Sequence, residues 1–587
     1  MSMYDERNEG MRLILRYLKR YKKLFLINVI SVFGFALVEL GIPTIVADMI
    51  DVGITNLDQA YIYKMGMVIV VISFLGVGGT VLLGYCCAKI STNITRDIRN
   101  DLFSHAQQFS PSEYNKFGTS SMITRTNNDA YQIQMFVNVI LRTALLTPVM
   151  MVVSFIMTMK SSLELSWIIL GTIPVIIIGV IIVAKISGPL SMNQQSSLDF
   201  LNRISRENLT GIRVIRAFNN DLHEAKRFET ANTQFTNYSK RLFKLMMLTS
   251  PLFFLLMNIA ALGIYFVASF MINTGNLPVG QLVAFMDYLF HAMFSVMLFC
   301  TVFMMYPRAA VSAKRILEVL ECEPMIQEKE DGVVTGTGCK EVEFDHVSFT
   351  YPNSEAAVLK DVSFKVSPGQ TVAFIGSTGS GKSTLINLIP RLYDCTRGKI
   401  LVDGVNVKDY QLDALRSKIG FISQKAFLFN GTIAQNLRYG KSDATDEELV
   451  AACKIAQAYD FILEKPNGFN EEITEGSTNM SGGQKQRLSI ARALVKKPEI
   501  FIFDDSFSAL DFKTDATLRN ALKSVTKEAI TMVVAQRIST IMQADLIVVL
   551  NEGRVVGMGK HQELLKKCPI YYEIAASQLS EEELKHE

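Results

Sequence analysis

The sequence predicts an all-α transmembrane domain of six helices, followed by an α/β domain that carries a phosphate-binding loop. Three observations support this fold class. The first half contains about six long apolar runs, each near or above the ~20 residues that a helix needs to cross a bilayer. Short strand-like segments and helical patterns begin at Glu341. Between one such strand and helix lies GSTGSGKST, Gly376–Thr384, with G-x-x-x-x-G-K-[ST] spacing.

The composition favours a membrane protein with at least two domains. Hydrophobic residues make up 49% of the 587 residues and charged residues only 20%, which is apolar for a soluble protein. The net charge of +3 is too close to neutral to indicate a nucleic-acid partner. The eight cysteines form no C-x-x-C pair or His/Cys cluster, so neither a zinc site nor a disulfide framework is indicated.

The N-terminal half begins with a basic amphipathic segment. Met11–Lys23 mixes apolar and basic side chains, so residues 1–23 are predicted to include an elbow helix at the membrane surface. Residues 24–321 are predicted to form the transmembrane domain with cytoplasmic helix extensions. Its apolar runs are Leu24–Val46, Met65–Ile90, Ile133–Met157, Leu165–Ile186, Met246–Ile272 and Val279–Tyr306.

The connections between these runs alternate in kind. Residues 91–132 and 187–245 are long and basic, whereas the other connections are short and carry little positive charge. By the positive-inside rule, the long connections and both termini are cytoplasmic. The long connections keep helical apolar spacing, so we expect extended helices that reverse near Phe117–Arg125 and Gly211–Asn219.

Four ionisable residues lie well inside the apolar runs: Glu39, Arg142, Asp287 and His291. Such residues are costly in a membrane and are functional candidates by default. Asp287 and His291 share a helix face at i, i+4 spacing. Glu39, Asp287 and His291, with the flexible side chain of Met286, are therefore candidate substrate-pocket residues. The alternatives are a structural polar contact between helices and ordinary lipid-facing methionines.

Residues 322–340 are polar and glycine-containing and are predicted to be a linker, followed by a nucleotide-binding domain over 341–587. In the phosphate-binding loop, backbone N–H groups and the following helix dipole face the phosphates. Lys382 is expected to reach the β/γ-phosphates and Ser383 to contact Mg²⁺. The whole loop is Gly376, Ser377, Thr378, Gly379, Ser380, Gly381, Lys382, Ser383 and Thr384.

Two further motifs follow the phosphate-binding loop along the chain. MSGGQKQR (Met480–Arg487) places Gly-rich backbone at a helix start, and EIFIFDD (Glu499–Asp505) is an apolar strand that ends in carboxylates. With these motifs, nearly the whole chain resembles a half-transporter of the ATP-binding-cassette exporter family. The resemblance implies two cassettes that close head-to-tail on two ATPs with Mg²⁺. The signature of each chain then completes the site of its partner.

The same resemblance implies roles for individual residues. It assigns adenine stacking to Tyr351, the Q-loop to Gln424, the signature to Ser481, Gly482, Gly483 and Gln484, and the D-loop to Asp511. It assigns Mg²⁺ to Ser383, Gln424 and Asp504. The two predicted reversals resemble the coupling helices of the family.

Two residues depart from the family pattern. Asp505 stands where the family usually has Glu, the base that positions the attacking water, and Gln536 stands at the switch position of a His. An Asp carboxylate is set back by one C–C bond, about 1.5 Å, and a misplacement near 1 Å can cost on the order of 10²-fold in rate. Together they predict a site that binds ATP and hydrolyses it slowly. The alternative is that Asp505 still serves as the base.

The expected function is therefore ATP-driven export of hydrophobic or amphipathic compounds, of multidrug type, by a heterodimer in which this chain has the degenerate site. The expected partners are membrane lipids and a second half-transporter with an intact catalytic site, in a bacterial inner membrane. Three alternatives stay open: a lipid or lipopeptide flippase, a homodimeric exporter, and a regulatory or receptor subunit that binds ATP without pumping.

Overall fold

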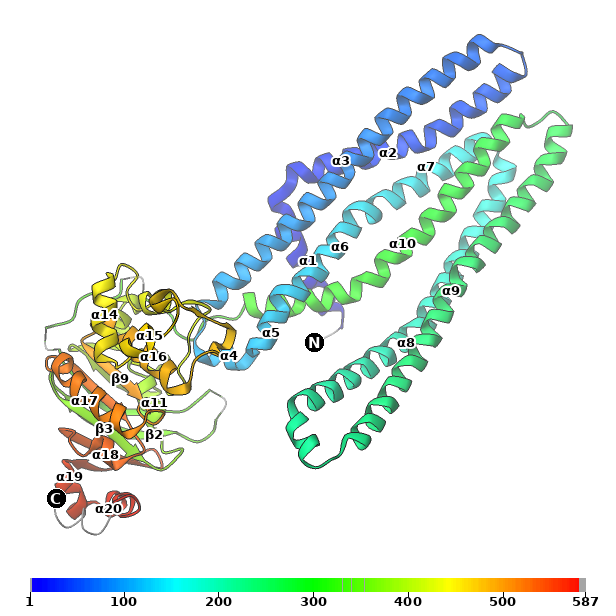
Figure 1. The fold of residues 1–587 in the computed structure, drawn as a ribbon. Coiled ribbons are helices and arrows are strands. Elements are labelled where there is room, and N and C mark those ends of the chain that lie inside the picture. The colour runs from blue at the N-terminus through cyan, green and yellow to red at the C-terminus, as the bar shows by residue number, and fades with distance from the viewer. Residues whose placement is uncertain (1–2, 330, 339, 353, 580–587) are drawn as a thin grey trace. The chain divides into compact units, whose positions relative to one another are not determined.

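The computed structural model describes residues 3–329, 331–338, 340–352 and 354–579. Within them the chain forms two compact units (Figure 1). The first contains the chain up to Gln107 and Thr119–Cys322, and the second contains Gln108–Gly118 and the chain from Glu323 onward. The first named strand of the described residues begins at Val342. The predicted pairing of an all-α domain with an α/β domain is confirmed.

Long helices build the first unit. Six segments among the described residues are long and apolar enough to span a membrane: Gly10–Ile54, Gln59–Ala106, Thr119–Ser161, Leu163–Ala217, Asp221–Asn273 and Val279–Phe299. The helices are α1 (Met3–Leu18), α2 (Lys22–Asp48), α3 (Gln59–Ala106), α5 (Thr119–Thr124), α6 (Ala130–Val139), α7 (Leu145–Ser161), α8 (Leu163–Ala217), α9 (Asp221–Asn273) and α10 (Val279–Leu320). Two π-helical turns join α5, α6 and α7 into one rod.

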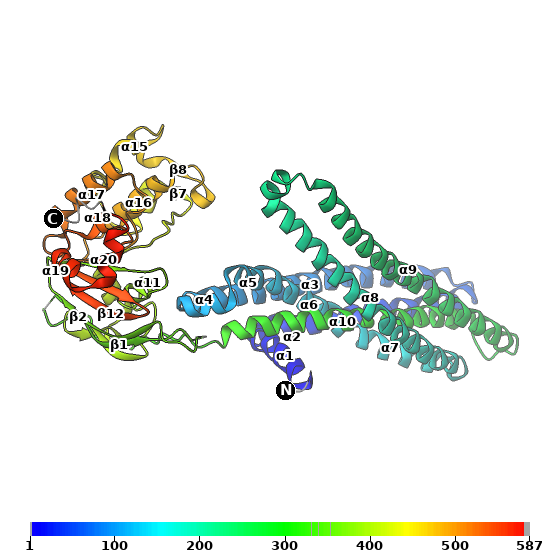
Figure 2. The ribbon, with the colours of Figure 1, turned by 90° about the horizontal axis from the view of Figure 1, so that it is seen from below.

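The helices α8 and α9 reach far beyond a bilayer. A helix of 55 residues such as α8 is about 80 Å long, whereas the hydrocarbon core is about 30 Å thick. The two helices lie side by side, and the end at which they reverse stands apart from the other helices of the unit (Figure 2). The reversal at Phe218–Asn220 overlaps the end of the predicted segment.

The first reversal lies earlier than predicted. The helix α3 ends at Ala106, a short helix α4 (Pro111–Phe117) follows, and Gly118 ends it at a positive φ of 77°. We expected the turn near Phe117–Arg125, but residues 119–125 of that stretch are helical. The cause is local: Ser110 accepts from the Ser112 backbone, and its own N–H donates to the Glu113 carboxylate at 2.6 Å. This capping box starts a new helix before the predicted turn.

The predicted elbow helix is bound to α3. The Tyr17 hydroxyl donates to Asp101 Oδ2 at 2.7 Å, and the Tyr21 hydroxyl donates to Asp97 Oδ2 at 2.7 Å. Arg20 forms ion pairs with both carboxylates, at 3.5 Å to Asp97 and 3.3 Å to Asp101. These contacts fix the chain just before it enters α2.

The described residues of the second unit form three sheets. A six-stranded sheet has the order β12-β11-β3-β10-β9-β6, an antiparallel sheet has the order β2-β1-β4-β5, and β7 pairs with β8. The strands are β1 (Val342–Phe349), β2 (Leu359–Val366), β3 (Thr371–Gly376), β4 (Arg397–Val402), β5 (Val405–Asn406), β6 (Ile419–Ile422), β7 (Gly431–Thr432), β8 (Glu472–Ile473), β9 (Ile500–Asp504), β10 (Ile530–Val534), β11 (Leu546–Asn551) and β12 (Arg554–Gly559).

Among the described residues, this unit contains α4 and further helices that begin after β3. They are α11 (Lys382–Asn387), α12 (Leu412–Ser417), α13 (Ile433–Arg438), α14 (Asp446–Ile455), α15 (Tyr459–Leu463), α16 (Gly482–Val495), α17 (Phe512–Thr526), α18 (Ile538–Ile541), α19 (His561–Lys567) and α20 (Pro569–Ala576).

The large sheet has a hydrophobic core on each face. Along β3, Ala373 and Ile375 belong to one buried cluster, whereas Val372 and Phe374 belong to the other. This alternation is the period of a strand covered on both faces. The strands β3, β6, β9, β10 and β11 are parallel, so their carboxyl ends meet at one edge, where ligands bind in open α/β sheets.

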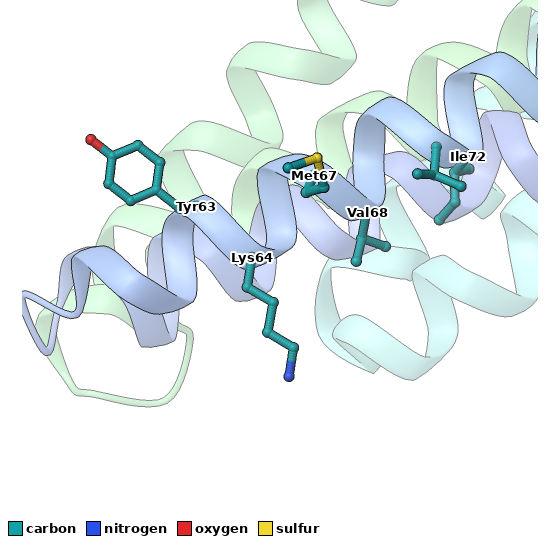
Figure 3. A pocket seen from close by; sticks show the side chains of 6 residues that line it. Tyr63, Lys64, Met67, Val68 and Ile72 are labelled. Atoms are coloured by element: carbon teal, nitrogen blue, oxygen red, sulfur yellow. The ribbon is translucent and has the colours of Figure 1, made fainter.

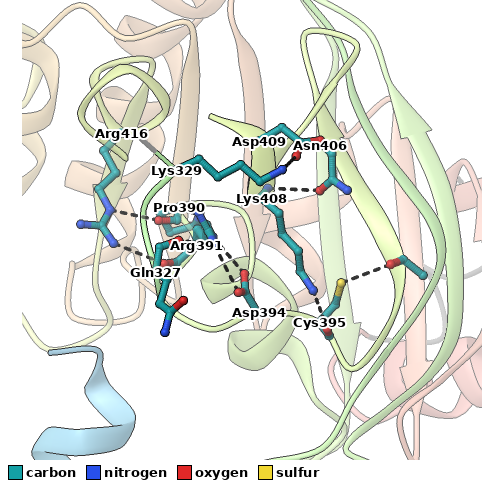
Figure 4. A network of polar contacts seen from close by, with 11 residues as sticks. Gln327, Lys329, Pro390, Arg391, Asp394, Cys395, Asn406, Lys408, Asp409 and Arg416 are labelled. Atoms are coloured by element: carbon teal, nitrogen blue, oxygen red, sulfur yellow. Dashed lines mark hydrogen bonds and ion pairs between the residues drawn. The ribbon is translucent and has the colours of Figure 1, made fainter. Parts of the chain in front are cut away.

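The segment after Cys322 runs against the second unit rather than standing free. Arg391 is buried and donates to the Gln327 carbonyl at 3.1 Å and to the Asp394 carboxylate at 3.0 Å (Figure 4). Lys329 forms an ion pair with Asp409. Further on, the backbone of Val333 donates to the Asp409 carbonyl at 2.8 Å. The connection between the spans and the sheets is therefore held in place by hydrogen bonds.

Candidate nucleotide site and membrane groove

The phosphate-binding loop has the backbone that its motif requires. It leaves β3 at Gly376 and enters α11 at Lys382, as predicted. Gly381 has φ of 98°, and a Cβ on it would lie 2.8 Å from Leu359. A Cβ on Gly376 would collide with the Leu550 carbonyl. Only glycine fits both positions, so the tight curl of the loop depends on the sequence pattern.

The Lys382 ammonium lies inside this curl. It donates to the Gly376 carbonyl at 2.9 Å, the Ser377 carbonyl at 2.8 Å and the Ser380 hydroxyl at 3.4 Å. Burial lowers the pKa of Lys382, and the carboxylates of Asp505 and Asp504 oppose that shift. A cation held by neutral carbonyls in a partly buried loop is suited to receive phosphate oxygens.

A hydroxyl and a carboxylate face one another beside the loop. Ser383 Oγ, in the first turn of α11, donates to Asp504 Oδ1, at the end of β9, at 2.9 Å. Burial raises the pKa of Asp504, while the Ser383 hydrogen bond opposes the rise. Magnesium in nucleotide sites commonly takes one or two such protein oxygens and phosphate oxygens. The donor set therefore fits a Mg²⁺–nucleotide, although the described residues contain no metal cage of three or more His, Cys, Asp or Glu.

Asp505 is held by two amide side chains. Its Oδ2 accepts from Gln536 Nε2 at 2.8 Å and from Gln424 Nε2 at 3.3 Å. The backbone of Asp505 adopts a left-handed φ of 47°, and its N–H donates to the Val534 carbonyl at 3.0 Å. Burial raises the pKa of Asp505, and the Gln424 hydrogen bond opposes the rise. Three predicted residues from the ends of β6, β9 and β10 are thus brought together.

Tyr351 lies beside the same helix start. Its hydroxyl hydrogen-bonds Thr384 Oγ1 at 3.0 Å, and its ring meets the edge or face of Phe349 and Tyr393 at centroid distances of 4.8 and 5.3 Å. We did not predict Tyr393. Its aromatic side chain follows α11 in the sequence RLYD, and that was the available signal.

The signature residues form a separate, exposed helix start. Ser481 caps α16: its hydroxyl accepts from the Gln484 backbone at 3.3 Å, and its own N–H donates to Gln484 Oε1 at 3.0 Å. Ser481 and Gly482 are exposed, and Met480 before them is buried in the core. Among the described residues, no hydrogen bond joins this helix start to Gly376–Thr384. Asp511 caps α17 by accepting from Thr514 N at 2.9 Å, which lowers the Asp511 pKa.

Gln578 also supports the site and was missed. It accepts a hydrogen bond from Ile538 N at 2.8 Å and donates to the Gln536 carbonyl at 2.9 Å. The segment after β10 is therefore pinned by a residue beyond α20. No local pattern in the sequence indicates this contact, because the partners are 40 residues apart or more.

Only some of the predicted pocket residues of the membrane domain line one groove. Met286 and Asp287 line a groove of 390 Å³ between α2 and α10. His291 Nε2 lies 3.9 Å from Asp287 Oδ2, which is too long for a hydrogen bond. Glu39 and Arg142 do not line this groove. The sequence also missed Thr44 and Tyr288, whose hydroxyl oxygens lie 2.6 Å apart and join the two helices.

A second hollow of 540 Å³ lies along one face of α3 (Figure 3). It is lined by Tyr63, Lys64, Met67, Val68, Val71 and Ile72. Tyr63 and Lys64 at its end point away from the helix axis, as aromatic and basic anchors do at a membrane surface. The rest is apolar, so this surface is suited to lipid tails.

Six candidate spans among the described residues and a strand–loop–helix with the phosphate-loop sequence pattern, carried on one chain, indicate an ATP-dependent membrane transporter. The comparisons with known proteins agree. Residues 25–297 match the ABC transporter transmembrane region, and residues 359–508 match the ABC transporter family. The chain belongs to the ABC transporter family. It is an integral membrane protein and an exporter half-transporter with an ATP-hydrolysing cassette.

Similar proteins extend over nearly the full length. The chain is 38% identical to the uncharacterized ABC transporter ATP-binding protein YfiB of Bacillus subtilis, over 97% of this chain and 99% of that protein. It is 34% identical to a putative multidrug export ATP-binding/permease protein of Staphylococcus aureus, over 83% and 84% of the two chains. A bacterial Atm1-family ABC exporter solved with ATP bound has the same fold, with a TM-score of 0.81 at 24% identity, over 95% of this chain and 99% of that one.

Proposed function

We propose that this chain is the degenerate-site subunit of a heterodimeric exporter that moves hydrophobic or amphipathic compounds out of a bacterial cell. The single observation that carries the proposal is the clamp on Asp505. Its carboxylate is short, its exposed fraction is 8%, and the amides of Gln536 and Gln424 both donate to one oxygen. A base held in this way stands back from the position where a glutamate would meet water.

Binding does not depend on that base. Lys382, Ser383 and Asp504 supply a cation, a hydroxyl and a carboxylate in one place, and Tyr351 adds an aromatic ring for the adenine. We therefore assign ATP and Mg²⁺ as the ligands, with Ser383, Asp504 and Gln424 near the metal. ATP supplies the free energy of transport, whereas Asp505 and Gln536 make this chain's own site slow.

Two exposed surfaces support a partner subunit. The signature Ser481–Gln484 is intact, and Ser481 and Gly482 at the start of α16 are exposed, so that they can complete a partner's site. The reversal between α8 and α9 exposes Leu209, Phe218 and Leu222 by 79%, 79% and 88%. Phe218 and Leu222 flank the turn itself, and large apolar side chains so exposed beside one turn favour an interaction surface. We assign that surface to docking on the second half-transporter.

The proposed cargo is of multidrug type, in line with the name of the Staphylococcus aureus relative. The proposed location is the cell membrane of a bacterium, with the nucleotide-binding unit in the cytoplasm. The basic residues of the long connections support that orientation. A homodimeric exporter remains the second candidate, because burial raises the pKa of Asp505 and so makes its carboxylate a stronger base.

The test is ATP turnover by the full chain in lipid nanodiscs, alone and with a candidate partner half-transporter. We expect slow turnover alone and fast turnover only in the pair, abolished when the partner's catalytic glutamate is replaced. Fast turnover by the chain alone, lost on Asp505→Ala, would instead establish the homodimeric pump.

A further inference from the structure

The groove between α2 and α10 is built as a preformed site. Its α2 wall is Ile42, Pro43 and Val46, and its α10 wall is Val283, Met286, Asp287 and Phe290. The hydroxyls of Thr44 and Tyr288 meet at 2.6 Å and join the two walls. The neighbouring cluster of Leu40, Ala47, Ala284 and Tyr288 is buried. These contacts join the two walls of the groove directly.

One charge lies in this apolar lining. The Asp287 side chain is 49% exposed, and it is the only acidic or basic residue among those that line the groove. Its one ion partner among the described residues is His291, at 3.9 Å. A carboxylate in a membrane-spanning helix is costly unless a counter-charge accompanies it. The groove thus favours a ligand that brings its own positive charge.

The neighbouring side chains narrow the class of that ligand. Phe290, one turn along α10, is 38% exposed and stacks on Phe294 at a centroid distance of 5.6 Å. An aromatic ring beside a carboxylate suits an organic cation, and the thioether of Met286 adapts to varied apolar shapes. The groove lining offers a metal ion only one carboxylate, whereas Ca²⁺ takes six to eight oxygen ligands.

We propose that this groove binds a monovalent organic cation with an apolar body. The cationic centre lies against Asp287, and the body lies along Phe290, Met286 and the α2 wall. The proposal names the cargo class of the exporter and in that respect rests on the proposed function. Binding itself does not require ATP turnover, so the two can be tested separately.

The test uses two ions of nearly equal size and opposite charge. Tetraphenylphosphonium and tetraphenylborate binding is measured by equilibrium dialysis of the full chain in nanodiscs without nucleotide, with empty nanodiscs subtracted. Asp287→Asn should weaken tetraphenylphosphonium binding by about tenfold or more and should not weaken tetraphenylborate binding. Asp287→Glu, which keeps the charge, should retain most of the affinity. Phe290→Leu should lower the affinity for tetraphenylphosphonium by about threefold.

The matched control is Glu164→Gln, which removes an exposed carboxylate in the first turn of α8 that does not line the groove, and it should leave both affinities unchanged. Equal tetraphenylphosphonium affinity in wild type and Asp287→Asn would overturn the site. An equal loss of affinity for both ions in Asp287→Asn would also overturn the site, because that result indicates a structural role for Asp287. Charge-selective binding without ATP-driven transport of tetraphenylphosphonium would keep the site and refute organic cations as the cargo.

Discussion

The two ends of the nucleotide site differ in the side chains that they provide for binding and for hydrolysis. At the phosphate end, Lys382 lies among loop carbonyls, and Ser383 donates to Asp504 at 2.9 Å. At the other end, a short carboxylate is held by Gln536 at 2.8 Å, and this amide cannot gain a proton as a histidine does. The difference indicates that binding and turnover are separable in one cassette, because different residues at the edge of one sheet support them.

The largest effect is expected at the phosphate end. Lys382→Ala removes the cation of the loop, so affinity for ATP should fall by roughly 10- to 100-fold, the value of lost charge-assisted hydrogen bonds. The measurement is binding of a fluorescent ATP analogue to the full chain. The control is Lys566→Ala, in the last turn of α19, which should bind normally. Unchanged affinity for ATP in Lys382→Ala would contradict the claim that the phosphate end of the site supports binding.

A smaller effect is expected at the aromatic side of the site. Tyr351→Ala should weaken ATP binding by about tenfold through loss of base stacking. Tyr351→Phe keeps the ring and loses only the hydrogen bond to Thr384, so its effect should be below about threefold. Binding of inorganic triphosphate, which has no base, is the control and should be unchanged in both variants. A loss of triphosphate binding in Tyr351→Ala would mean that Tyr351 shapes the loop instead.

The smallest effect concerns stability far from the ligand. Lys497 and Lys441 form ion pairs with Glu448, at 2.7 and 3.0 Å, and hold the pKa of Glu448 at about 2. Because this folded pKa lies below the ordinary 4.5, the stabilisation is present above about pH 4.5 and is lost between about pH 4.5 and 2. Glu448→Gln should therefore lower the thermal midpoint slightly at neutral pH. That difference should shrink as the pH falls below 4.5, and a constant difference would contradict the ion-pair account.

The parts of the molecule that depend on neighbours in the chain were predictable. The phosphate-binding loop lies between a strand and a helix as its motif requires, and the six apolar runs correspond to the six spans. The place of the first reversal was missed because Ser110 and Glu113 form a capping box that the apolar spacing does not register. The contacts of Asp505 with Gln536 and of Thr44 with Tyr288 join residues 31 and 244 positions apart. No local pattern carries such contacts, since folding alone brings these residues together.

The most direct measurement is the single-turnover rate of ATP hydrolysis by the full chain and by Asp505→Glu, Gln536→His and the double variant. If a short base held by an amide limits turnover, the double variant should be faster than wild type by on the order of 10²-fold. Because the two side chains touch, the two single effects should not simply add. A wild-type rate that already equals that of the double variant, and that disappears in Asp505→Ala, would show that Asp505 is a fully competent base and would contradict the account.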